Sequence, residues 1–179
     1  PEVEDIYPVG DHQTIDFDPG PAAETMEGKF RPGHFIGMSE VVYRLLRITS
    51  PDSLFMGQKD FQQFSIIRKL ITDFQMPIQL VMCPTVREAN GLAMSSRNVR
   101  LSPEARDKAG VIFNILTSGK MLFEQKTPAK FVQDIALDAL RKVNFDPEYF
   151  EVVNGYTLEP VEHMEEAEQI VACCAVKVE

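Results

Sequence analysis

The sequence contains little cysteine, and the few cysteines present do not have the spacing of a disulfide framework. Only 3 of the 179 residues are cysteine: Cys83, Cys173 and Cys174. An odd number without a regular spacing favours a reducing compartment, so we expect a cytoplasmic protein. Cys173 and Cys174 are adjacent in an apolar segment, and we expect them to be small core residues on opposite faces of a strand. The 3 histidines are scattered along the chain, and they predict no metal site.

Long apolar runs and targeting segments are also missing from the sequence. No run approaches the ~20 apolar residues that a membrane-spanning helix needs, so no membrane partner is expected. We find no signal or transit peptide, and the sequence opens on Pro1 without an initiator methionine, which predicts a fragment of a longer protein. With 44% hydrophobic and 25% charged residues, the composition is that of a soluble globular protein and excludes overall disorder.

Negative charge dominates the two ends of the chain but not its middle. The formal net charge is −9, which disfavours a nucleic-acid partner. Residues 1–28 contain no lysine or arginine, whereas residues 29–100 carry 10 basic and 5 acidic side chains. This cationic segment suits a small anionic ligand such as a nucleotide phosphate, and a solvated basic face explains the charge alone equally well.

The first half of the chain is predicted to form an α/β unit. The expected order is helix–strand–helix–strand, which implies a parallel sheet with crossover helices. The predicted elements are a helix at 37–48, a buried strand at 53–56, a helix that Asp60 opens, and a second buried strand at 78–82. Ahead of them, alternating apolar residues predict a short strand at 13–17.

The second half is predicted to form an α+β unit. Ser102-Pro103-Glu104 is typical of a helix start, and we expect one helix from there to about Phe123. A further helix should extend to about Val143, and strands at 149–153 and 169–178 should complete the unit. We place the domain boundary near Pro84.

Gly57, Gln58, Lys59 and Asp60 lie where a predicted strand ends and a helix begins. Ligands of open α/β sheets bind at that edge, and the helix N-terminus offers N–H groups and a partial positive charge to a phosphate. Gly57 permits close backbone approach, Lys59 adds a full charge, and Asp60 could cap the helix or hold a ribose hydroxyl. Taken alone, these four residues are better explained by an ordinary strand–helix turn with a surface lysine.

Met94-Ser95-Ser96-Arg97, in a polar loop, supplies a compact set of phosphate donors. Two hydroxyls and a guanidinium occupy three consecutive positions, and arginine binds phosphate oxygens bidentately. Considered alone, the same residues are equally well explained by a polar surface loop between two domains.

Two further segments could contribute to a site at the same sheet edge. Gln63, in the first turn of the helix after Lys59, suits a substrate with hydroxyls and a carboxylate, although a solvated helix face is the simpler interpretation. Arg31 could place a cation there. His34, close behind it, is more typical of a structural hydrogen-bond partner than of a catalyst.

In order and spacing, these segments resemble the pantoate–β-alanine ligase family, adenylate-forming enzymes of the nucleotidylyltransferase group. The matching blocks are Arg31 to Phe35, Gly57 to Gln63, Pro84 to Glu88 and Gly91 to Asn98. The resemblance is strong over residues 30–101 and weaker but collinear elsewhere. It implies a Rossmann-like nucleotide-binding domain, with residues 1–84 as its C-terminal portion, and a small α+β lid domain formed by residues 85–179.

The resemblance also implies roles for individual residues. It assigns ATP binding to Gly57, Gln58, Lys59, Asp60, Val86, Met94, Ser95, Ser96 and Arg97. Asp60 would lie near the ribose and Lys59 near the phosphates, while the Val86 backbone would contact adenine. Gln63 matches a pantoate-binding glutamine, and Arg31 matches a basic residue near the active site.

The implied reaction joins pantoate to β-alanine with ATP as the co-substrate. The pantoate carboxylate attacks the α-phosphorus, pyrophosphate leaves, and the β-alanine amine displaces AMP from the pantoyl-adenylate. The implied catalytic residues are Lys59, Ser95, Ser96 and Arg97, which neutralise developing charge together with a Mg²⁺ held through the phosphates. The family also implies a homodimer, paired through the strand that His12 to Asp16 resemble.

One signature of the family is absent, and two alternatives stay open. The sequence contains no His-x-Gly-His, and the N-terminal half that carries it is missing, so we expect negligible ligase activity from the chain alone. The first alternative is a non-catalytic nucleotide-binding or dimerisation module. The second is a nucleic-acid-binding domain, although the basic residues lack interleaved stacking aromatics and the acidic flanks oppose it.

Overall fold

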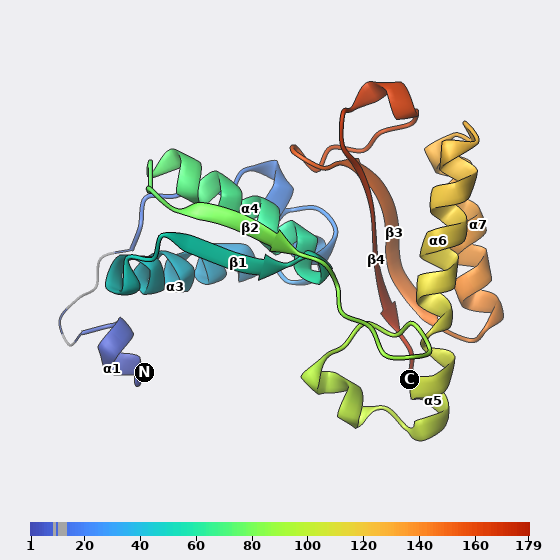
Figure 1. The fold of residues 1–179 in the computed structure, drawn as a ribbon, viewed down its shortest axis with the longest axis horizontal. Coiled ribbons are helices and arrows are strands. Elements are labelled where there is room, and N and C mark those ends of the chain that lie inside the picture. The colour runs from blue at the N-terminus through green and yellow to red at the C-terminus, as the bar shows by residue number, and fades with distance from the viewer. Residues whose placement is uncertain (9, 11–13) are drawn as a thin grey trace. The chain divides into compact units, whose positions relative to one another are not determined.

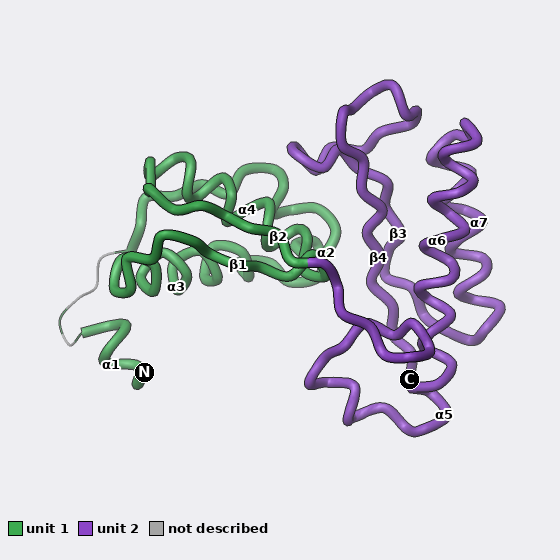
Figure 2. Tube along the Cα trace, viewed as in Figure 1, with its two compact units in different colours: residues 1–83 green, residues 84–179 purple. Residues whose placement is uncertain are grey.

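The structure is a computed structural model that describes residues 1–8, 10 and 14–179. The chain divides between Cys83 and Pro84 into two compact units, residues 1–83 and 84–179 (Figure 2). Each unit contains a hydrophobic cluster of its own.

The first unit is built on a two-stranded parallel sheet (Figure 1). Its helices and strands are α1 (Val3–Ile6), α2 (Glu27–Phe30), α3 (His34–Thr49), β1 (Ser53–Gly57), α4 (Phe61–Asp73) and β2 (Gln79–Cys83). β1 pairs with β2 in register, with Leu54 opposite Leu80. Helix α4 connects the two strands and is the crossover that parallel neighbours require. The predicted helix–strand–helix–strand order is therefore confirmed.

The two long helices of this unit pack against the sheet through one apolar cluster. Its buried members come from both helices, and strand residues pack against them: Leu46, Ile67, Leu70 and Ile71, with Leu54, Met56 and Leu80. Because side chains alternate along a strand, Phe55 points to the other face of β1, and it is 66% exposed. Parallel sheets are ordinarily covered on both faces, so this face is suited to a further covering element.

The short strand predicted at 13–17 is wrong for the residues that the structure describes. Residues 14–17 are not in a strand, whereas His12 and Gln13 lie outside the described residues. The Ile15 N–H donates to the Glu40 side chain of α3 at 2.8 Å, and Ile15 and Phe17 pack against the apolar cluster. The alternating apolar residues thus pack against the helices of this unit. The pairing of subunits through His12 to Asp16 stays a prediction.

The second unit is α+β, as predicted. Its helices and strands are α5 (Pro103–Lys108), α6 (Val111–Glu124), α7 (Ala129–Lys142), β3 (Asp146–Asn154) and β4 (Ile170–Lys177). β3 and β4 pair antiparallel, with Phe150 opposite Cys174, and α7 contributes Val132 and Ala136 to the core around Phe150. Cys174 packs against this core, and burial raises the pKa of Cys173 to about 12 and that of Cys174 to about 11.

The single helix predicted from Ser102 to about Phe123 is wrong, because α5 ends at Lys108 and α6 begins at Val111. The Asn90 side-chain amide donates to the carbonyls of Arg106 and Asp107 at 2.9 and 3.1 Å, which are acceptors that a continuous helix would use. Gly110 also lies so close to the loop that a Cβ there would be 2.2 Å from the Asn90 carbonyl oxygen. The loop therefore interrupts the helix.

None of the helices in the described parts of the chain is long and apolar enough to cross a bilayer.

Candidate functional site

The carboxyl ends of β1 and β2 form the first candidate site. Gly57, the last residue of β1, pairs with Cys83, the last residue of β2, so both strands end at the edge where ligands of parallel sheets bind. Gln58–Asp60 form a 3₁₀ turn directly after β1, and α4 begins at Phe61. Gly57, Gln58, Lys59 and Asp60 are all exposed, so the predicted ATP-binding stretch is accessible at this edge.

Asp60 occupies the N-cap position of α4, as the sequence predicts. Within the described part of the chain, however, its side chain makes no capping hydrogen bond. The carboxylate is therefore available to another donor, such as a ribose hydroxyl. The neighbouring Lys59 ammonium is exposed and adds a full positive charge to the partial charge of the helix N-terminus.

The two glutamines of the first turn of α4 have different surroundings. Gln62 is 6% exposed. Its Nε2 donates to the carbonyls of Ala22 and Thr25 at 2.7 and 2.8 Å, and its Oε1 accepts from the Glu27 N–H at 3.1 Å. Gln62 therefore fastens the segment from Ala22 to Glu27 to α4. Gln63 is half-buried and stays the candidate for pantoate.

Arg31 follows α2 in the first unit and is 48% exposed. Its guanidinium pairs with the Glu27 carboxylate at 3.0 Å. An exposed pair of this kind is weak, so an anionic ligand could replace Glu27, and the role of Arg31 near the active site stays a prediction. The His34 ring lies beside Phe35, with 5.0 Å between the ring centroids, and the histidine is half-buried.

A short hairpin in the second unit brings Val86 next to Met94. The Met94 N–H donates to the Val86 carbonyl at 2.9 Å, and the Glu88 N–H donates to the Leu92 carbonyl at 2.8 Å. Gly91 lies in the turn with φ of +95°, a conformation that favours glycine. The hairpin thus joins the predicted adenine contact to the start of the predicted phosphate-binding segment.

Ser95, Ser96 and Arg97 follow the hairpin at the start of a 3₁₀ helix, Ser96–Arg100. Ser95 is its N-cap, and its Oγ accepts from the Arg97 N–H at 3.2 Å. Ser96 and Arg97 are exposed. A hydroxyl and a guanidinium are therefore presented side by side, which is a donor set suited to phosphate oxygens.

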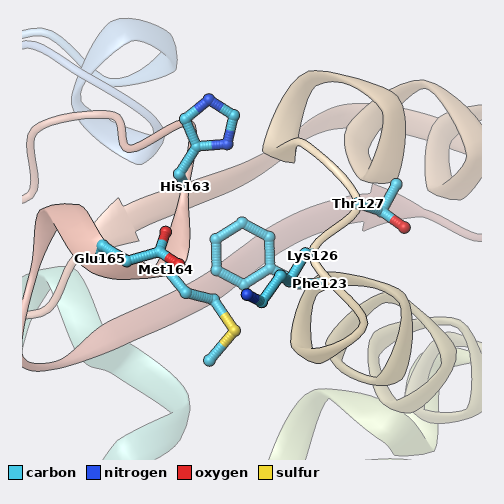
Figure 3. A pocket seen from close by; sticks show the side chains of 6 residues that line it. All are labelled: Phe123, Lys126, Thr127, His163, Met164 and Glu165. Atoms are coloured by element: carbon cyan, nitrogen blue, oxygen red, sulfur yellow. The ribbon is translucent and has the colours of Figure 1, made fainter.

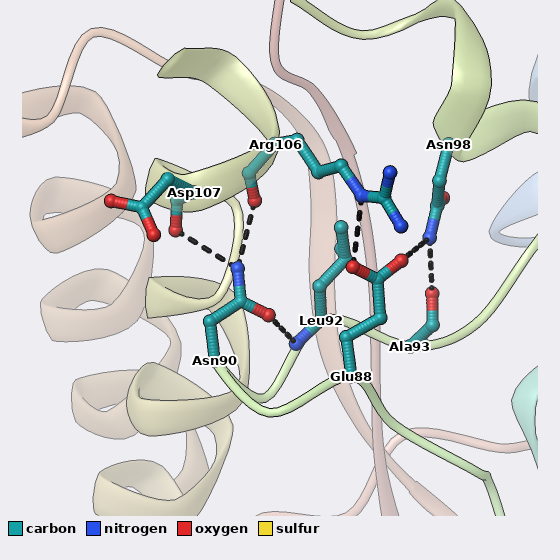
Figure 4. Close-up of polar contacts among 7 residues, drawn as sticks. All are labelled: Glu88, Asn90, Leu92, Ala93, Asn98, Arg106 and Asp107. Atoms are coloured by element: carbon teal, nitrogen blue, oxygen red, sulfur yellow. Dashed lines mark hydrogen bonds and ion pairs between the residues drawn. The ribbon is translucent and has the colours of Figure 1, made fainter. Parts of the chain in front are cut away.

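The residues that fix this segment were not predicted from the sequence. The Glu88 carboxylate accepts from Asn98 Nδ2 at 2.8 Å and from Arg106 Nε at 2.9 Å (Figure 4). Both hydrogen bonds hold the pKa of Glu88 below its usual value of 4.5, and the bond from Arg106 has the larger effect. Glu88 lies 10 and 18 residues from these partners, so no periodicity reveals the network. Glu88 and Asn98 drew attention only as members of the blocks that resemble the family.

A separate pocket in the second unit has a volume of about 210 Å³ (Figure 3). It is lined by Phe123, Lys126, Thr127, His163, Met164 and Glu165, which include none of the predicted site residues. Among the described residues, no three histidine, cysteine, aspartate or glutamate side chains gather to hold a metal ion. The nucleotide-binding hypothesis therefore rests on two accessible segments and not on this pocket.

The two candidate segments belong to different units. Gly57 to Asp60 and Gln63 belong to the first, and Val86 with Met94 to Arg97 belong to the second. Within each unit, the elements described above bring the predicted residues to one strand edge or one hairpin. We predict that both segments bind the same triphosphate. Because the segments belong to different units, this stays a prediction.

The chain is similar to known proteins along its whole length. The family model for pantoate-beta-alanine ligase matches residues 1–179. A pantothenate synthetase from Porphyromonas gingivalis (strain W83) is 39% identical over 176 residues, which cover 98% of this chain and 62% of that protein. A pantothenate synthetase from Bacteroides fragilis (strain YCH46) is 40% identical over 179 residues, with the same shares covered. The chain thus spans 62% of the length of these curated relatives.

Solved structures share the fold. The pantothenate synthetase from Thermus thermophilus matches with a TM-score of 0.90 and 36% identity, over 99% of this chain and 63% of that chain. The pantoate-beta-alanine ligase from Francisella tularensis, in complex with beta-gamma ATP and beta-alanine, matches with a TM-score of 0.67 and 30% identity. That match covers 96% of this chain and 61% of the Francisella chain.

Proposed function

Because the chain belongs to the pantoate–β-alanine ligase family, we propose that it forms part of an ATP-dependent ligase that joins pantoate to β-alanine. The family match over residues 1–179 is the observation that carries this proposal. The Francisella relative is complexed with two ligands of this reaction, beta-gamma ATP and beta-alanine.

The proposed reaction has two steps. The pantoate carboxylate attacks the α-phosphorus of ATP, the bond to the bridging oxygen breaks, and pyrophosphate leaves. The β-alanine amine then attacks the acyl carbon of the pantoyl-adenylate, releases AMP and loses a proton as the amide forms. The first step requires alignment and charge neutralisation rather than an enzyme nucleophile.

Polar and cationic side chains of both units suit the first step. Lys59, Ser95, Ser96 and Arg97 would neutralise the charge that develops on the phosphates, and a Mg²⁺ that arrives with ATP would supply further positive charge. The N-cap carboxylate of Asp60 would hold the ribose, and the remaining residues of the two segments would bind through backbone and side-chain contacts: Gly57, Gln58, Val86 and Met94.

Two further assignments complete the proposal. Gln63 would bind pantoate, because its amide suits both the hydroxyls and the carboxylate of that substrate, while Gln62 is occupied within the chain. The enzyme would be a homodimer, paired through the segment from His12 to Asp16. Sedimentation of the purified protein at several concentrations tests the dimer.

The proposal is tested by restoring the part of the enzyme that the chain does not match. In what we call the fusion enzyme, the unmatched part of the P. gingivalis synthetase precedes residues 1–179. We expect pantoate-dependent pyrophosphate release, and pantothenate only when β-alanine is added. The chain alone should show negligible activity, since it spans 62% of the length of its relatives.

Each contrary outcome has a separate meaning. A folded fusion enzyme that binds ATP but releases no pyrophosphate would favour the non-catalytic nucleotide-binding module instead. Robust pantothenate formation by residues 1–179 alone would contradict the expectation that the chain is an inactive fragment. The intact P. gingivalis protein is the positive control in both assays.

A further inference from the structure

The Glu88 carboxylate connects three parts of the second unit. It lies on the hairpin that joins Val86 to Met94, and its two oxygens accept from different elements. Oε1 accepts from Asn98 Nδ2 at 2.8 Å, in the 3₁₀ helix, and Oε2 accepts from Arg106 Nε at 2.9 Å, in α5 (Figure 4). The Glu88 side chain is only 18% exposed, so these bonds are partly shielded from water.

Asn98 fixes the far end of the phosphate-binding segment. Asn98 is 8% exposed, and its Nδ2 donates a second hydrogen bond to the Ala93 carbonyl at 3.0 Å. The near end of the segment is fixed by the bond from the Met94 N–H to the Val86 carbonyl, at 2.9 Å. Ser95, Ser96 and Arg97 therefore lie between two anchored positions.

The hairpin itself is fastened to the helices. Asn90 accepts from the Leu92 N–H at 3.1 Å and donates to the carbonyls of Arg106 and Asp107. The Arg87 guanidinium lies over the Phe113 ring of α6, 3.9 Å from its centroid. The hairpin that carries Glu88 is thus tied to α5 and α6 by these contacts.

We propose that Glu88 and Asn98 are positioning residues, which hold Met94 to Arg97 in the conformation that binds the ATP phosphates before ATP arrives. A loop that is ordered in advance avoids the entropy loss of ordering on binding. This inference rests on the proposed function, because it assumes that the segment binds ATP. Neither residue touches the nucleotide in this scheme, so each acts through the exposed donors, Ser96 and Arg97.

The ion pair also resolves an electrostatic conflict. A lone carboxylate next to a phosphate-binding segment would repel the nucleotide, and Arg106 compensates that charge. The bonds from Arg106 and Asn98 lower the pKa of Glu88, so the ionised form is the one that the folded unit stabilises. The stabilisation that these bonds give to the ionised form is therefore present at neutral pH, and it is lost as the pH falls below 4.5 through the lowered pKa.

The test compares two carboxylates of the same unit. Glu88→Gln replaces one acceptor oxygen with an NH₂ group, which donates and cannot accept, so one of the two bonds from Asn98 and Arg106 is lost. The matched control is Glu104→Gln, at a 78% exposed glutamate in α5 that pairs with Lys108 at 2.6 Å. In the fusion enzyme, we expect Glu88→Gln to raise the KM for ATP about tenfold, the equivalent of one charged hydrogen bond. The KM for pantoate should stay within about twofold, and the control should change neither.

A second measurement uses residues 1–179 alone and needs no activity. The ¹⁵N order parameters of Ser96 and Arg97 should be near 0.85 in the unsubstituted chain, and in Glu104→Gln, and should fall below about 0.6 in Glu88→Gln and Asn98→Ala. Amide spectra of β3 and β4 report whether each variant still folds. If one variant fails to fold, the other supplies the comparison.

The outcomes separate the positioning role from the proposed function. If Glu88→Gln behaves like Glu104→Gln in both measurements, the positioning role is wrong and the ligase assignment is untouched. If Glu88→Gln raises both KM values equally, the effect is general loss of structure, and the positioning role is again contradicted. If the unsubstituted fusion enzyme is folded but neither binds ATP nor forms pantothenate, the proposed function fails, and this inference fails with it.

Discussion

Replacing Gln62 with alanine should destabilise the first unit, whereas the same change at Gln63 should leave its stability unchanged. Gln62 is 6% exposed, and its amide makes three hydrogen bonds to the backbone of Ala22, Thr25 and Glu27. Alanine removes all three hydrogen bonds, so the carbonyls of Ala22 and Thr25 and the N–H of Glu27 lose the Gln62 amide as a partner. At ~1 kcal/mol for each bond, and more where a group becomes buried and unsatisfied, the expected loss is about 2–4 kcal/mol.

Hydrogen exchange followed by NMR is the appropriate assay, because two compact units need not unfold together. The amide of Leu70 in α4 is a suitable reporter, since Leu70 is 0% exposed and belongs to the first unit's apolar cluster. A loss of about 3 kcal/mol corresponds to exchange that is roughly 100-fold faster, at about 1.4 kcal/mol for each factor of ten. Gln63→Ala should change this rate less than about threefold, as is usual for substitutions outside such networks.

In activity, by contrast, the Gln63 variant should be the one that is affected. In the fusion enzyme, Gln63→Ala should raise the KM for pantoate about tenfold or more, because a hydrogen bond to a charged substrate is lost. The reasoning is refuted if Leu70 exchange is unchanged in Gln62→Ala, or if both variants accelerate it equally. An unchanged KM for pantoate would remove Gln63 from the site without affecting the structural role of Gln62.

Further outcomes are expected at one lysine, two glycines and one cysteine. Lys59→Ala in the fusion enzyme should lower kcat/KM at least ~100-fold, as for one preorganised donor to a developing charge, whereas Lys69→Ala, at an exposed lysine of α4 that pairs with Asp73, should not. Gly110→Ala should destabilise the second unit by about 1–3 kcal/mol, since its Cβ would be 2.2 Å from a backbone oxygen. In contrast, a Cβ at Gly37 in α3 would meet nothing within 4 Å, so Gly37→Ala should raise the free energy of unfolding by about 0.5–1 kcal/mol. Burial raises the pKa of Cys174 to about 11, so its alkylation by iodoacetamide should still accelerate with each unit of pH up to pH 10, and a plateau near pH 8 would contradict this.

The order of elements in the first unit was predictable because local signals and tertiary packing agree there. The apolar residues of α4 recur at helical spacing, and Ile67 and Leu70, which are 0% exposed, belong to the cluster that packs against the sheet. Gly57 ends β1 in the sequence and in the structure. The same agreement holds for α3 and β2, whose observed bounds differ from the predicted ones by three residues or fewer.

The errors share one physical cause, which is a tertiary contact that overrides a local pattern. Ser102 to Phe123 has the composition of one helix, but the Asn90 side chain takes two of the carbonyls that this helix would use. The alternation at residues 14–17 is typical of a strand, but Ile15 and Phe17 meet the helices of the first unit instead. Neither contact leaves a signal within the segment that it changes.

Adjacent polar residues are divided in the same way at both candidate segments. Gln62 and Asn98 are buried, and their amides are hydrogen-bonded within the chain. Their neighbours Gln63 and Arg97 lie at or near the surface. A sequence motif cannot make this distinction, because each motif contains both kinds of residue. We propose that the buried members serve stability and loop order and that the accessible members bind the ligand, so substitutions at the two kinds of position should change different measured quantities.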